Sequence, residues 1–70
     1  MNIEDKYYSY LDKVYQLNLA MDKLIEARLH VEYANDTTLH DELVFVIKDT
    51  DKSIKFYNRQ IDSLKEEITR

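Results

Sequence analysis

The 70-residue sequence contains no glycine, no proline and no cysteine. Without glycine, tight turns with positive φ have to use asparagine or aspartate, so hairpin-rich β folds are disfavoured and long helices are favoured. Without cysteine, disulfides and thiolate metal sites are excluded. So short a chain, read as a single domain over residues 1–70, has a core of little net stability. Oligomerisation or partner binding is therefore the remaining means of stabilisation.

The sequence also lacks a long apolar run and an excess of basic residues. Its longest continuous apolar segment, Leu43 to Ile47, is far shorter than a membrane span. The first residues are acidic and form no hydrophobic signal region, so we expect a cytoplasmic protein with no membrane partner. The net charge is −4, from 14 acidic and 10 basic residues. This acidic balance weighs against general nucleic-acid binding, which normally needs a net basic protein.

Apolar residues recur through the chain at steps of three and four. This heptad spacing places them along one side of an α-helix. The first set is Tyr7, Tyr10, Val14, Leu17, Met21, Leu24 and Val31, and the second is Leu43, Ile47, Thr50, Ile54, Tyr57, Ile61, Leu64 and Ile68. The pattern predicts an all-α fold, a long antiparallel helical hairpin whose two stripes face each other as in a coiled coil.

The expected hairpin has a first helix over about 3–33, a turn over 34–37 and a second helix over about 38–69. Asn2 is a suitable N-cap for the first helix, and Asn35 can end it in the left-handed conformation. Thr38 is the expected N-cap of the second helix, with Asp41 in a capping-box position.

The segment Asp49-Thr50-Asp51 is the weak point of the second helix, because all three residues have low helix propensity. We expect a continuous helix with Thr50 in the seam. The alternative is a kink or break there, which would give three helices.

The apolar sector of the first helix is wider than one partner helix can cover. We therefore expect two hairpins to pair as a homodimeric four-helix bundle. The candidate oligomer-interface residues flank the predicted seam, and they are Tyr8, Leu11, Tyr15, Leu19, Ile25, Leu29, Tyr33 and Val44. The alternative is that the tyrosine cluster near the start of the chain binds a different protein, since tyrosine is enriched at interfaces.

A mixed basic and aromatic surface is predicted on the second helix, nearly opposite its seam. Four basic residues at steps of 4, 3 and 4 form one line beside two phenylalanines. The candidate partner-binding residues are Phe45, Lys48, Lys52, Lys55, Phe56 and Arg59. An acidic protein surface or a nucleic-acid backbone could bind there. The simpler interpretation is a solvated face balanced by Asp49, Asp51 and Asp62.

The sequence contains no catalytic, cofactor-binding or metal-binding motif. Glu26 and His30 are one helical turn apart, but a metal site needs further ligands that the sequence does not supply. The serines have no histidine nearby, and there is no glycine-rich phosphate loop. Arg28 falls within the first apolar stripe, where a charge either sets the pairing register or extends its stem to solvent.

We therefore interpret the chain as a non-enzymatic protein–protein interaction module, without a cofactor or small-molecule substrate. Helical hairpins of this size include inhibitors, immunity-like proteins and small phage regulators, so a cytoplasmic regulator that binds a larger protein is the leading hypothesis. The alternatives are an accessory protein in nucleic-acid transactions, acting through the line from Lys48 to Arg59, and a purely structural self-assembling element.

Overall fold

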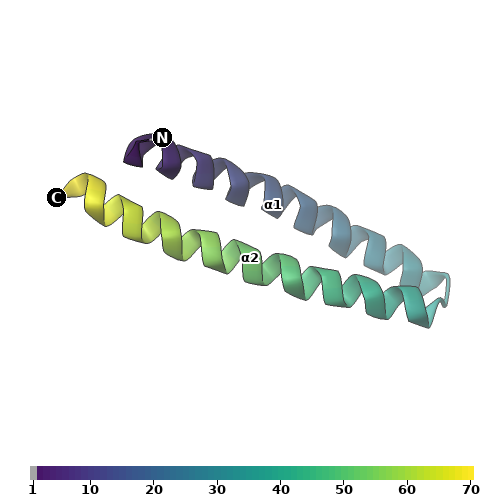
Figure 1. Cartoon of the computed structure of the whole chain (residues 1–70). Helices are drawn as coiled ribbons and strands as arrows, with labels where there is room; N and C mark the ends of the chain where they lie inside the picture. The colour runs from purple at the N-terminus through teal and green to yellow at the C-terminus, as the bar shows by residue number, and fades with distance from the viewer. Residues whose placement is uncertain (1) are drawn as a thin grey trace.

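The computed structural model describes residues 2–70, which form two antiparallel helices, α1 (Ile3–Tyr33) and α2 (Thr37–Thr69). Figure 1 shows the helices side by side, with both chain ends at one end of the hairpin and the turn at the other. The hairpin measures 53 × 17 × 14 Å. No strand occurs within residues 2–70, so the all-α helical hairpin is confirmed. Neither helix has the length of apolar sequence needed to cross a membrane.

The start of α1 is fixed by the predicted N-cap. The Asn2 side-chain oxygen accepts a hydrogen bond from the Asp5 backbone N–H at 2.8 Å. Glu4 and Asp5 in the first turn suit the positive end of the helix dipole. The predicted starting point of the first helix is therefore confirmed.

Asn35 occupies the position in the turn where a glycine is usual, as predicted. Asn35 has φ of 60°, and its N–H donates to the Glu32 carbonyl at 3.1 Å. The Asp36 N–H donates to the Val31 carbonyl at 3.4 Å. These two bonds are those of a Schellman motif, which satisfies the last carbonyls of α1.

The predicted N-cap of the second helix was wrong by two residues. α2 begins at Thr37, and its N-cap is Asp36, whose carboxylate accepts from the Leu39 N–H at 3.0 Å. Thr38, the predicted N-cap, is already inside the helix. The Schellman motif brings Asp36 out of α1 in an extended conformation, which leaves its side chain free to cap α2 two residues earlier than Thr38 would.

The alternative of a break at Asp49-Thr50-Asp51 is also wrong, because α2 is continuous through these residues. The Thr50 hydroxyl donates to the Val46 carbonyl at 2.8 Å, so its polar group is satisfied inside the helix. Asp51 forms an i,i+4 ion pair with Lys55 at 2.9 Å. The strand-like run from Leu43 to Ile47 likewise lies within α2.

The predicted seam forms the only shared core of the hairpin in the described residues. Every member of both stripes is half-buried or buried. Only Ile54 and Ile61, at 9% and 8% exposed, count as buried. The Tyr10 and Tyr57 rings meet across the seam with centroids 5.4 Å apart, which fixes the level at which the helices pair. Two helices in contact along one side leave the rest of each helix open to solvent.

Candidate protein-interaction surface

The exposed apolar side chains of α1 lie beside the seam, except Leu19 and Tyr33, which lie nearly opposite it. All seven candidate oligomer-interface residues on this helix are exposed: Tyr8, Leu11, Tyr15, Leu19, Ile25, Leu29 and Tyr33. Tyr8 and Tyr33 are 65% and 84% exposed, far more than the half-buried Tyr7 and Tyr10 of the seam. The eighth candidate, Val44, is on α2 and is half-buried.

The position of this surface follows from helix geometry. Each residue turns the helix by about 100°, so the residue that follows a seam residue lies next to the seam on one side. Applied to the seam of α1, this rule defines a second line, which we name the outer stripe. It comprises Tyr8, Leu11, Tyr15, Asn18, Asp22, Ile25, Leu29 and Glu32.

The corresponding line on α2 is far more polar. The same rule gives eight residues, of which only Val44 is apolar: Val44, Lys48, Asp51, Lys55, Asn58, Asp62, Lys65 and Thr69. In an antiparallel hairpin the two lines lie on the same side of the molecule. One broad side of the hairpin is therefore apolar along α1 and charged along α2.

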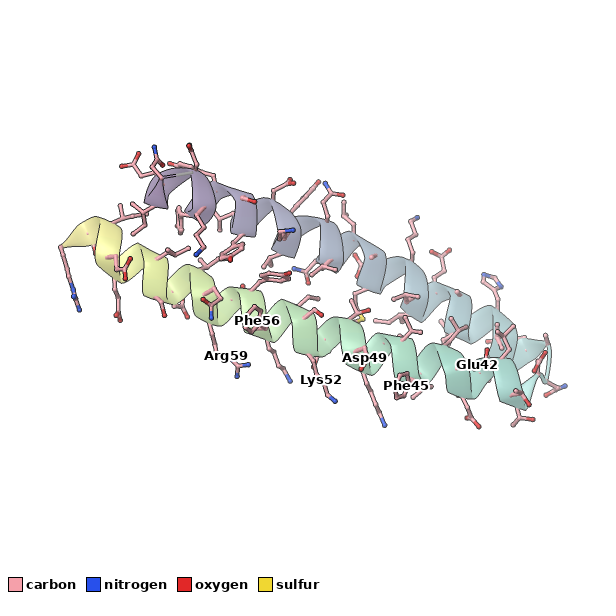
Figure 2. All side chains as sticks on the ribbon, viewed as in Figure 1. Glu42, Phe45, Asp49, Lys52, Phe56 and Arg59 are labelled. Atoms are coloured by element: carbon pink, nitrogen blue, oxygen red, sulfur yellow. The ribbon has the colours of Figure 1, made fainter. Side chains whose placement is uncertain are left out.

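Four of the six candidate partner-binding residues lie on the far side of α2 from α1, and the other two, Lys48 and Lys55, belong to the polar line just described. Phe45, Lys52 and Arg59 project away from α1 in Figure 2. The two phenylalanines are 66% and 48% exposed, and the four basic residues are all exposed. Phe45 and Phe56 are eleven residues apart, or about 16 Å along the axis. This surface, the back face of α2, is accessible as the sequence predicted.

The back face also carries acidic residues, of which the sequence analysis named Asp49 but not Glu42. Glu42, Phe45, Asp49, Lys52, Phe56 and Arg59 continue one line at steps of three and four (Figure 2). The same spacing rule would have found Glu42. The line has two acids, Glu42 and Asp49, followed by two bases, Lys52 and Arg59, so it carries no net charge. Lys55, beside this line, pairs with Asp51 at 2.9 Å, which further reduces the basic character of this side of α2.

Arg28 occupies the seam near the turn and is half-buried. Its Nε is shielded from solvent and has no hydrogen-bond partner among residues 2–70. Such a donor is costly, because a shielded polar group without a partner loses its hydration. The side chain of Arg28 therefore extends only partly to solvent. This geometry is compatible with both predicted roles, setting the pairing register and extending the stem to solvent.

The two histidines lie near the turn, His30 in α1 and His40 in α2. Across residues 2–70, no three His, Cys, Asp or Glu side chains are grouped as metal ligands would be. His30 is exposed, and the His40 Nδ1 lies 3.7 Å from Asp41. An open depression of about 370 Å³ lies at the turn, lined by Val31, Glu32, Asn35, Asp36, Thr37 and His40.

Comparison with protein-family models, with curated proteins and with solved structures finds no match to this chain. The surfaces described above are therefore the basis for any functional assignment.

Proposed function

We propose that the chain is a non-enzymatic protein–protein interaction module, a small regulator or inhibitor that binds a larger protein through a helical face. The observation that carries this proposal is the exposed apolar and aromatic surface of α1, from Tyr8 to Tyr33, in a hairpin that has only two buried side chains among residues 2–70. Exposed apolar surface of this extent is typical of interaction sites.

The two exposed surfaces have different roles in this proposal. The apolar side of α1 pairs the hairpins into a dimeric four-helix bundle, because burial of apolar surface is the main driving force of association. The back face of α2 contacts the larger protein. Its phenylalanines supply apolar anchors, and its acidic and basic ends select a surface with the opposite order of charges.

The test replaces both Phe45 and Phe56 with serine and compares capture of proteins from the native host by the two forms, with identification by mass spectrometry. We expect a protein that is retained by the original chain and lost with the double variant. The control variant is Tyr8→Ser, which removes a comparably exposed aromatic side chain from α1. Circular dichroism should show equal helicity for all three proteins. Capture that is identical for the original chain and the double variant would refute a docking role for the back face.

Nucleic-acid binding through the line from Lys48 to Arg59 is the second candidate function. The observation that favours it is the exposure of all four cations on one side of α2. Such binding would fall steeply with salt concentration, because phosphate contacts release counterions. A mobility shift of DNA or RNA at low salt that disappears with Lys52→Ala and Arg59→Ala would favour this candidate over protein capture.

A further inference from the structure

The hairpin exposes more surface than a compact protein of its mass. The exposed area is 5515 Å² for a chain of 8.5 kDa. The scaling of surface with mass gives roughly 4,650 Å² for a compact monomer of this size. The excess is about 870 Å², close to the ~800 Å² that each partner contributes to a standard protein interface. One interface of ordinary size would therefore bring the chain to the exposure of a compact protein.

The six inner positions of the outer stripe of α1 have the same order of apolar and polar residues when they are read in either direction. Leu11 and Leu29 are equally distant from its centre, and so are Tyr15 and Ile25. The centre is the polar pair Asn18 and Asp22, and Tyr8 and Glu32 form the ends. An interface between identical chains about a two-fold axis needs this self-complementarity, because residue i meets residue j and j meets i.

We infer that the outer stripe binds the outer stripe of a second copy of the chain, with the two α1 helices antiparallel and the two-fold axis between Asn18 and Asp22. The inference deepens the proposed interaction function, on which it rests, by naming the partner, the orientation and the residues at the axis. In this arrangement Leu11 is level with Leu29 of the second copy, and Tyr15 is level with Ile25 of the second copy.

Polar complementarity selects the antiparallel orientation. The Asn18 amide is level with the Asp22 carboxylate of the second copy and can donate a hydrogen bond to it. The Tyr8 hydroxyl is level with the Glu32 carboxylate of the second copy and can do the same. A parallel pair would instead place Asp22 beside Asp22 and Glu32 beside Glu32, and like charges at an interface are costly.

The other surfaces of the hairpin are poorer matches for the outer stripe. The corresponding line of α2 offers only Val44 as an apolar contact and would place Lys48, Asp51 and Lys55 against leucines. The back face of α2 alternates charges with its two phenylalanines. The hydrophobic gain is largest where apolar residues meet apolar residues, and only α1 provides them on both sides.

Thiol cross-linking tests the orientation, since the natural chain has no cysteine. The variants L11C and L29C are treated with a short bis-maleimide, separately and as an equimolar mixture. We expect covalent dimers in the mixture and none in the separate samples, because in an antiparallel pair two copies of position 11 are about 27 Å apart. The variant L39C, mixed with L11C, is the control and should give none.

Three outcomes would overturn the inference. Dimers in the separate L11C sample indicate parallel pairing, and dimers in the L39C mixture indicate that another surface is used. Failure to cross-link in every sample, with helicity retained, shows that no second copy binds this stripe.

Capture of a larger protein through Phe45 and Phe56 is measured independently. Loss of cross-linking with capture retained overturns only the dimer inference, and loss of capture with cross-linking retained overturns only the docking role.

Discussion

Replacing Leu29 with alanine is expected to weaken self-association without unfolding the hairpin. Leu29 is 44% exposed on the outer stripe of α1. Full burial of a leucine contributes about 2 kcal/mol, so burying the exposed half of this side chain contributes about 1 kcal/mol. The two-fold axis doubles the effect to about 2 kcal/mol for each dimer, which corresponds to roughly a 30-fold weaker dissociation constant.

Leu39 provides a matched control on the other helix. It is 43% exposed, almost the same as Leu29, but it lies in the first turn of α2 and not on the outer stripe. Sedimentation equilibrium should show the 30-fold weakening for Leu29→Ala and an unchanged dissociation constant for Leu39→Ala. Equal weakening by both variants, or by neither, would refute the assignment of the interface to the outer stripe.

Three further predictions address the axis, the core and the turn. Asn18→Asp places four carboxylates at the two-fold axis, so the dimer should dissociate at low salt and partly recover at high salt, as measured by sedimentation. Ile61→Ala should lower the free energy of unfolding by about 2–3 kcal/mol in urea titrations, because Ile61 is buried in the seam. A cost equal to that of Ile25→Ala would contradict the seam assignment. Asp36→Ala should cost about 1 kcal/mol by removing the N-cap of α2, and a larger effect from Thr38→Ala would contradict that cap.

The main features of the fold were predictable because the seam is encoded by spacing alone. Leu17 and Ile54 were assigned to facing stripes from steps of three and four, and both lie in the seam. Asn35 was assigned to the left-handed position because no glycine was present, and it has φ of 60°. These features depend only on local geometry and residue type, which the sequence contains.

The N-cap of the second helix was predicted wrongly because several neighbouring residues compete for that role, whereas the expected continuous helix through residues 49–51 was confirmed. Asp36, Thr37 and Thr38 can each cap a helix, and the choice depends on where the Schellman motif releases the chain. The low helix propensities of Asp49, Thr50 and Asp51 amount to fractions of a kcal/mol each. The Thr50 hydroxyl donates a hydrogen bond to the Val46 carbonyl, and Asp51 forms an ion pair with Lys55. Both interactions form within the helix, and propensity scales include neither.

The candidate surfaces were only partly predictable. The exposure of Tyr15 and Phe45 followed from their angles around each helix, and both are exposed in the structure. Half-burial of Val44 could not be deduced from its angle, because it depends on how closely the neighbouring helix packs. The partner that binds each surface depends on the complementary surface of another molecule, which this sequence does not contain. The partners are therefore proposals.

The mass of the unmodified chain in solution tests the central claim, that the outer stripe of α1 binds a second copy, most directly. Light scattering coupled to size-exclusion chromatography should give about 17 kDa, twice the 8.5 kDa of one chain, with dissociation on dilution. A mass of 8.5 kDa at every concentration up to the millimolar range would contradict the claim.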